Sequence, residues 1–167
     1  MKDIRVGIGY DIHRLVEGRE MWLGGVSVKS VTGALGHSDA DVVLHAICDA
    51  MLGATGQGNI GGHFPDTDVA YKGVRSSELV TSVYRLISAR GWRVINLDVN
   101  VHLEEPRIGG YLKRMAQVIA EMLEIDTDRV NLKPRTGEGL GEIGQSEAVA
   151  AQAVILVARD GEEAGDE

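Results

Sequence analysis

The chain has 167 residues, 44% of them apolar, and carries 17 basic against 25 acidic side chains, a formal net charge of -8. This length and apolar share predict one domain, residues 1–159, around a single core. The charge argues against a nucleic-acid-binding surface. No apolar run approaches the roughly 20 residues that cross a membrane, and acidic Asp3 and Asp11 come too early for a secretory leader. We therefore expect a cytoplasmic protein without a membrane or nucleic-acid partner, ending in an acidic, disordered tail at 160–167.

Residues 4–13 alternate as a β-strand does. One parity is apolar and the other contains glycines, which predicts that the apolar face packs and that the glycine face leaves room for a ligand. The apolar residues are Ile4, Val6, Ile8, Tyr10 and Ile12. Asp11 and His13 are two positions apart, so both side chains point to the same side of the strand.

A helix is predicted to begin near Ser38, because Asp41 follows three residues later and apolar residues continue at helical spacing. Asp41, His45 and Asp49 fall at i, i+4 and i+8 on its polar stripe, so that carboxylates flank His45 and can orient its ring. Cys48, the only cysteine, sits among apolar residues of this helix and is expected to be buried.

Asp11, His13 and His45 form a trio of metal-ligand type. Two histidines and one aspartate match a zinc site with three protein ligands and an open fourth position. They also match a two-histidine, one-carboxylate iron site. The plain alternative is that each histidine has an ordinary hydrogen-bonding partner in the core or on the surface.

Helical spacing continues in two later segments. Residues 76–90 are predicted as a helix capped by Ser76 or Ser77 and stopped at Gly91, and a further helix is predicted over about 110–124. Strict alternation predicts a strand over 93–103, and a second strand is predicted over 129–134.

Residues 147–158 remain ambiguous, because their alanines favour a helix and the run AVILV favours a strand. Together these elements indicate an α/β or α+β layer with helices stacked on a sheet.

Three loops contain residues suited to phosphates. His37 and Ser38 lie where the backbone N–H groups of a helix start favour an anion. Residues 58–68 combine glycines with carboxylates and a hydroxyl. This pattern is typical of a turn and also suits a phosphate-binding site. Residues 133–141 place two cations beside Glu138, which could hold a hard cation that already binds phosphates. The plain alternative for this last loop is a solvated turn.

Four strings occur in the order and spacing of the 2-C-methyl-D-erythritol 2,4-cyclodiphosphate synthase family: GIGYDIHRLVEG, LGHSDADVVLHAICDAMLG, FPDTD and NLKPRTGEGLG. The chain resembles this family from about Ile4 to Arg159. The resemblance implies an α+β fold with a mixed four-stranded sheet, helices on one face, and a homotrimer with active sites between subunits. Residues 147–158 would then be a strand. The implied reaction, in non-mevalonate isoprenoid precursor biosynthesis, is attack of the 2-phosphate of 4-diphosphocytidyl-2-C-methylerythritol 2-phosphate on its own β-phosphate, with release of CMP.

The resemblance also implies roles for individual residues. Zinc would bind Asp11, His13 and His45, and magnesium or manganese would bind Glu138 together with the substrate diphosphate. His37 and Thr136 match the family's transition-state stabilisers. The implied substrate-binding residues are Asp11, His13, His37, Ser38, Asn59, Ile60, Gly61, Phe64, Pro65, Asp66, Thr67, Asp68, Leu103, Arg107, Pro134, Arg135, Thr136 and Glu138. The cytidine contacts among them, in the segment from Leu103 to Gly109 and at Pro134 and Arg135, would come from a neighbouring subunit.

The chain departs from the family pattern at several positions. Asn59 stands where the family generally has Asp, and Glu104 is unusual beside a nucleotide pocket. Gln145 stands where many members have an Arg that lines the central cavity of the trimer. Two alternatives stay open: a trimeric paralogue that binds a cytidine nucleotide without turnover, and an iron-dependent oxygenase that rests on the metal trio alone.

Overall fold

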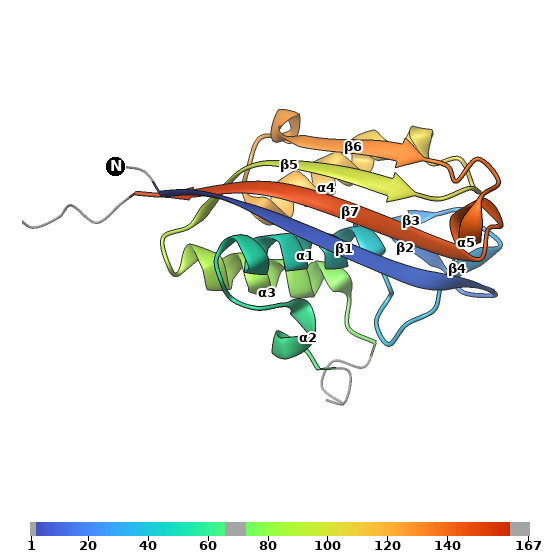
Figure 1. Ribbon diagram of the computed structural model, residues 1–167, viewed down its shortest axis with the longest axis horizontal. Coiled ribbons are helices and arrows are strands. Elements are labelled where there is room, and N and C mark those ends of the chain that lie inside the picture. Colours follow the sequence, from blue (N-terminus) through green and yellow to red (C-terminus); the bar gives the residue numbers. More distant parts are fainter. Residues whose placement is uncertain (1–2, 66–72, 161–167) are drawn as a thin grey trace, which may run out of the picture.

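A computed structural model describes residues 3–65 and 73–160 (Figure 1). Its elements in chain order are β1 (Asp3–Glu17), β2 (Met21–Leu23), β3 (Val26–Val28), β4 (Thr32–Ala34), α1 (Val42–Ala54), α2 (Ile60–His63), α3 (Ser76–Ser88), β5 (Arg93–His102), the 3-10 helix η2 (Gly109–Tyr111), α4 (Leu112–Leu123), the 3-10 helix η3 (Thr127–Arg129), β6 (Val130–Arg135), α5 (Gly141–Gly144) and β7 (Ala148–Arg159). Of the acidic tail expected at 160–167, residues 161–167 lie outside the described residues. None of the helices in the described ranges has the length and apolarity needed to cross a membrane.

The main sheet is mixed, as expected, but it has five strands instead of four. Their order is β4-β1-β7-β5-β6, and only β5 and β6 run parallel. The fifth strand, β4, is a three-residue edge strand beside the end of β1, too short to show alternation in the sequence. The ambiguous segment 147–158 forms β7, which pairs with β1 and β5 in the middle of the sheet.

The helices cover one face of this sheet. Along β1, Gly7 and Gly9 are buried beneath α1, whereas the five apolar side chains of the opposite parity are 44–65% exposed. Within the single chain, the expectation that the apolar face packs is therefore wrong, and at Gly7 and Gly9 the glycine face leaves no room for a ligand. The glycine face is filled by helix backbone, since a Cβ on Gly9 would lie 1.9 Å from the carbonyl oxygen of Ala46.

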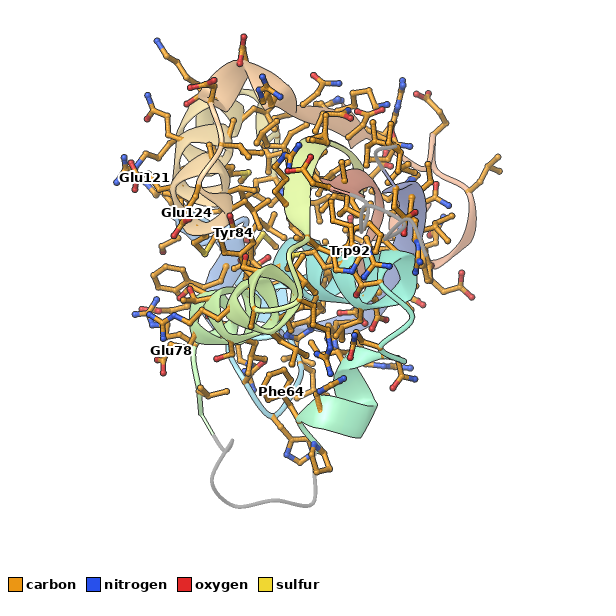
Figure 2. The ribbon with its side chains drawn as sticks, turned by 90° about the vertical axis from the view of Figure 1, so that its left-hand side faces the viewer. Phe64, Glu78, Tyr84, Trp92, Glu121 and Glu124 are labelled. Carbon is orange, nitrogen blue, oxygen red and sulfur yellow. The ribbon has the colours of Figure 1, made fainter. Side chains whose placement is uncertain are left out.

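The core lies between the sheet and the helices. Cys48 is fully buried in α1, as expected, and burial raises the pKa of its thiol. Helices α3 and α4 lie side by side, and Tyr84 on α3 points toward Glu124 at the end of α4, to which its hydroxyl donates at 3.4 Å (Figure 2).

A short hairpin ties the start of α1 to the rest of the fold. Strands β2 and β3 are joined through Gly24 and Gly25, both with positive φ, as a tight hairpin turn requires. The buried Asp41 carboxylate accepts the N–H groups of these glycines at 2.9 and 2.7 Å. It also accepts two N–H groups in the first turn of α1, so the position of this helix end is strongly specified.

Candidate functional site

Two elements bring the predicted metal ligands together. Asp11 and His13 lie on the helix-covered face of β1, at the same parity as Gly9. Because Gly9 has no side chain, the backbone of α1 at Ala46 can approach the strand closely. His45 precedes Ala46 in the first turn of α1, and this approach carries its ring to the Asp11 carboxylate.

The three ligand atoms form a tight triangle. Asp11 Oδ2 lies 3.0 Å from His13 Nε2 and 2.9 Å from His45 Nδ1, and the two ring nitrogens are 3.4 Å apart. A tetrahedral zinc ion with bonds of about 2.0–2.1 Å keeps its ligand atoms about 3.3 Å apart. The triangle therefore fits such an ion with small adjustments. The prediction that these residues gather in one cluster able to hold a metal is confirmed.

The charges within the triangle suit a cation. Burial raises the pKa of the Asp11 carboxyl, but hydrogen bonds to His13 and His45 outweigh it and hold that pKa well below its usual range. Burial lowers the pKa of His45, but the carboxylates of Asp11, Asp41 and Asp39 together outweigh burial and raise it. Asp11 is thus ionised at neutral pH, which is the form that binds a metal ion.

Residues that we did not predict contact the outer nitrogen of His45. Its Nε2 lies 2.9 Å from Ser76 Oγ and 3.3 Å from Ser38 Oγ. The expectation that Asp41 and Asp49 orient this ring is wrong, because both carboxylates are engaged by backbone N–H groups. In the sequence, Ser76 resembled an ordinary helix cap, so its pattern indicated no link to His45.

The loop that contains His37 and Ser38 reaches the metal cluster but does not cap α1. The N-cap is Asp41, so the helix begins at Val42 and not near Ser38 as predicted. The carbonyl oxygen of Ser38 accepts a hydrogen bond from Arg19 at 3.1 Å, which holds the loop against the segment after β1. His37 is exposed at the outer side of this loop.

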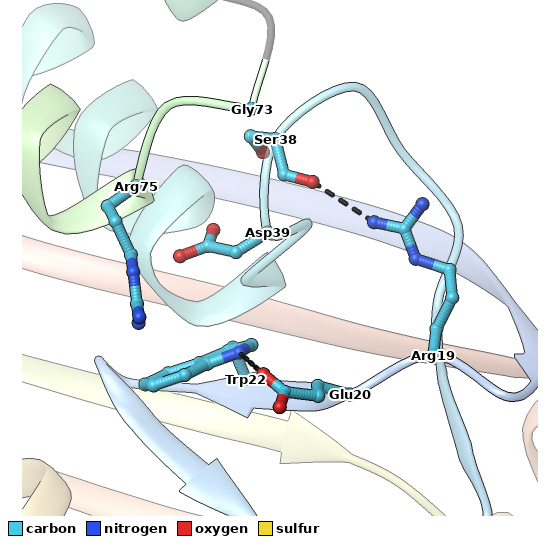
Figure 3. Close-up of a pocket in the computed structure, with 7 residues that line it drawn as sticks. All are labelled: Arg19, Glu20, Trp22, Ser38, Asp39, Gly73 and Arg75. Atoms are coloured by element: carbon cyan, nitrogen blue, oxygen red, sulfur yellow. Dashed lines mark hydrogen bonds between the residues drawn. The ribbon is translucent and has the colours of Figure 1, made fainter.

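A pocket of about 260 Å³ opens where this loop meets the start of α3 (Figure 3). Its lining residues are Arg19, Glu20, Trp22, Ser38, Asp39, Gly73 and Arg75. The Arg75 guanidinium lies 3.9 Å from the centroid of the Trp22 ring, and Glu20 accepts a hydrogen bond from the indole N–H of Trp22. Two cations and two carboxylates share this lining, so the pocket has no strong field of one sign.

The glycine-containing loop after α1 is attached to the helix that carries His45. Asp49, one turn after His45, accepts the N–H of Ile60 at 2.7 Å, and Asn59 caps α2 through its side-chain oxygen. Of the contacts expected in this loop, Asn59, Ile60, Gly61, Phe64 and Pro65 are described. The expected contacts Asp66, Thr67 and Asp68 lie outside the described residues.

A second cluster lies beyond the ends of the parallel strands β5 and β6. The N–H of Leu103 donates to the carbonyl oxygen of Arg135 at 2.8 Å, which joins the two chain segments. Glu104 accepts the N–H of Gly137 at 2.8 Å. Glu104, which stood out only as unusual for a nucleotide pocket, therefore holds the turn that follows β6.

That turn presents polar side chains outward. Thr136 donates a hydrogen bond to Glu138 at 2.9 Å, and Glu138 has a positive φ of 52°. Glu138, Pro134 and Arg107 are all exposed. Leu103, by contrast, is buried, so its side chain is not presented to a ligand.

The two clusters do not meet within one chain. Ile12 on β1 and Arg135 on β6 lie in the same cross-strand register, with β7 and β5 between them. Three strand spacings of about 4.8 Å place these strands about 14 Å apart. A single chain therefore does not bring the metal triad and the Glu138 turn into one compact site.

Comparison of the sequence finds similarity along most of the chain. The sequence model of the YgbB family matches residues 4–158. A curated relative from Syntrophomonas wolfei subsp. wolfei, named 2-C-methyl-D-erythritol 2,4-cyclodiphosphate synthase, is 51% identical over 154 residues, covering 92% of this chain and 98% of the relative.

Solved structures share the fold. The bifunctional IspDF from Campylobacter jejuni superimposes with a TM-score of 0.92 at 36% identity over 96% of this chain, which spans 43% of that longer protein. A 2C-methyl-D-erythritol-2,4-cyclodiphosphate synthase with bound CDP gives a TM-score of 0.85 at 38% identity, covering 92% of this chain and 99% of the other.

Proposed function

The chain belongs to the YgbB family of 2-C-methyl-D-erythritol 2,4-cyclodiphosphate synthases, and we propose that it catalyses the reaction named in its relatives. The observation that carries this proposal is the triangle of Asp11, His13 and His45, a ready-made cation site in a chain that matches such a synthase over nearly its full length.

The proposed reaction is an intramolecular phosphoryl transfer. An oxygen of the 2-phosphate of 4-diphosphocytidyl-2-C-methylerythritol 2-phosphate bonds to the β-phosphorus of the same molecule. The bond from that phosphorus to the oxygen it shares with the α-phosphorus breaks, and CMP leaves with this oxygen. Such a phosphorus–oxygen lyase step depends on in-line positioning and charge neutralisation more than on covalent catalysis.

The triad fits zinc in both geometry and donor chemistry. Asp11 offers an ionised carboxylate, and His13 and His45 offer ring nitrogens directed at the same point. Zinc bound there would supply Lewis-acid polarisation of phosphate oxygens. Glu138 would hold magnesium or manganese together with the diphosphate, since hard cations prefer carboxylate and phosphate oxygens.

Two observations support a homotrimer with active sites between subunits. The exposed apolar face of β1 is a row of large side chains that a symmetric partner would bury. The distance between the triad and the Glu138 turn is too large for one chain to hold both ends of a diphosphate. In the proposed assembly, the triad of one subunit faces the Glu138 turn of its neighbour.

The remaining residues would position the substrate. His37 and Thr136 would stabilise charge that develops on the phosphates, and Ser38 and the loop from Asn59 to Asp68 would contact the erythritol phosphate. The backbone from Leu103 to Gly109, with Arg107, Pro134 and Arg135, would bind cytidine, which the CDP complex of a relative supports. We place this activity in the cytoplasm.

A product assay tests the proposal. Purified protein loaded with zinc and magnesium is incubated with the 2-phosphate substrate, and products are followed by phosphorus NMR and mass spectrometry. We expect equal amounts of CMP and the cyclic diphosphate. Binding of CDP without CMP release would instead identify a non-catalytic paralogue, and metal analysis showing iron with oxygen consumption would identify the oxygenase.

A further inference from the structure

We infer that Ser76 and Asp39 form a hydrogen-bonded relay that sets the proton on His45 and orients its ring toward the metal. Neither residue is a metal ligand or an expected substrate contact. The inference rests on the metal site proposed above, and it adds two positioning residues to that site.

The relay is continuous from the helix to the loop. Ser76 is fully buried at the start of α3, and its Oγ lies 2.9 Å from His45 Nε2. The same hydroxyl donates a short hydrogen bond to Asp39 Oδ1. Asp39 also accepts the backbone N–H of Ser76 at 3.2 Å. Figure 3 shows the Asp39 carboxylate directed toward the start of α3.

This arrangement selects one tautomer of His45. The Nδ1 atom faces Asp11 and His13, so it must present a lone pair if a metal ion is to bind there. The ring proton of neutral His45 then belongs on Nε2. Ser76 Oγ can accept that proton, because its own proton is directed to Asp39.

Ser38 is a weaker candidate for the same task. Its Oγ is farther from His45 Nε2, at 3.3 Å, and it already accepts the N–H of Ala40 at 3.0 Å. Among the described residues, no carboxylate accepts a hydrogen bond from the Ser38 hydroxyl, whereas Asp39 accepts one from the Ser76 hydroxyl. Ser76 is therefore the residue whose removal should release the ring.

A purely structural role can be separated from this positioning role. The N-cap of α3 is Arg75, which makes no side-chain capping bond, and Asp39 supplies the cap by accepting the N–H of Ser76. Replacing Ser76 by Ala keeps that backbone N–H and its bond to Asp39. Only the hydroxyl between Asp39 and His45 is lost.

The experiment measures zinc affinity and metal geometry. Zinc-free full-length protein is titrated with zinc in competition with a chromophoric chelator, and cobalt(II) spectra of the same variants report the ligand field. Ser76→Ala should weaken zinc binding by about 10–100-fold and alter the cobalt spectrum. Ser76→Thr, which keeps a hydroxyl, should stay near the unmodified chain, as should the control Ser77→Ala on the same helix.

Two results would overturn the relay. The first is a Ser76→Ala protein with unchanged zinc affinity and cobalt spectrum. The second needs no variant: nitrogen-15 NMR of His45 in the zinc-loaded, unmodified chain should place the ring proton on Nε2, and a proton on Nδ1 would refute the inference. Absence of zinc binding by the unmodified chain would instead refute the metal site itself.

Discussion

Gly9 on β1 lies so close to Ala46 on α1 that a Cβ on Gly9 would come within 1.9 Å of the Ala46 carbonyl oxygen. Gly9→Ala must therefore push the helix away from the strand and move His45 from Asp11. Overpacking of this kind costs about 1–3 kcal/mol or more. We expect a lower denaturation midpoint together with reduced zinc content.

Gly53 supplies the control for this prediction. It lies in the same helix, and a Cβ there would meet only the carbonyl oxygen of Ile8, at 3.8 Å. Gly53→Ala should be neutral or stabilising by up to about 1 kcal/mol, because alanine favours a helix more than glycine does. Equal midpoints for Gly9→Ala and Gly53→Ala would show that helix and strand can separate without cost.

The metal triad predicts about one zinc ion per chain. His13→Ala or His45→Ala should lose most of this zinc, because two protein ligands and water do not replace the set of three. Inductively coupled plasma mass spectrometry of purified variants, with circular dichroism to verify folding, measures the loss. The half-buried His63, whose ring bonds to the carbonyl of Gln57 and not to the triad, provides His63→Ala as the control. Full zinc occupancy in both triad variants would contradict the assignment.

Glu138→Gln keeps the shape of the side chain and removes its charge. Zinc content should not change, because Glu138 is not part of the triangle of ligand atoms. Release of CMP should fall by at least about 100-fold, since the second cation loses its protein carboxylate. A magnesium titration of CMP release provides the measurement, and a titration curve identical to that of the unmodified chain would show that Glu138 has no part in metal binding.

The separation between the triad and the Glu138 turn predicts composite sites. His45→Ala and Glu138→Gln proteins should each be inactive, and hybrid trimers reassembled from both should recover part of the activity. Some interfaces in a hybrid then combine an intact triad with an intact turn from the neighbour. Native mass spectrometry identifies the hybrids, and activity no higher than that of either parent would argue against shared sites.

Much of this architecture could be predicted from local patterns. The alternation in 93–103 predicted β5 because its buried residues, such as Leu97 and Val99, recur at every second position. The pairing of Asp11 with His13 on one side of a strand followed from the same two-residue period. Spacing alone cannot reveal β4, whose three residues show no period, or Ser76, whose role depends on a contact 31 positions away.

The two faces of β1 show a different limit. Alternation distinguishes the apolar face from the glycine face, but it does not say what covers each face. The glycines suggested space for a ligand, whereas they allow the backbone of α1 to approach. The apolar row at Ile4 to Ile12 looked like core and is exposed in the single chain, because its partner lies outside that chain in the proposed trimer.

The last prediction concerns His102, which stands beside Arg135 across β5 and β6. Burial is the larger cause, and the Arg135 guanidinium the smaller one, of a pKa of His102 below its usual value of 6.5. Because folding disfavours the protonated ring, the stability from neutral His102 is present above pH 6.5 and is lost as the pH falls below it. Arg135→Gln removes one cause, so the pKa of His102 should rise and less stability should be lost on acidification. NMR titration of His102 and urea unfolding between pH 7 and about pH 5 measure both effects, with Arg114→Gln on α4 as the control. A pKa of His102 that is the same in both variants would show that Arg135 does not act on this ring.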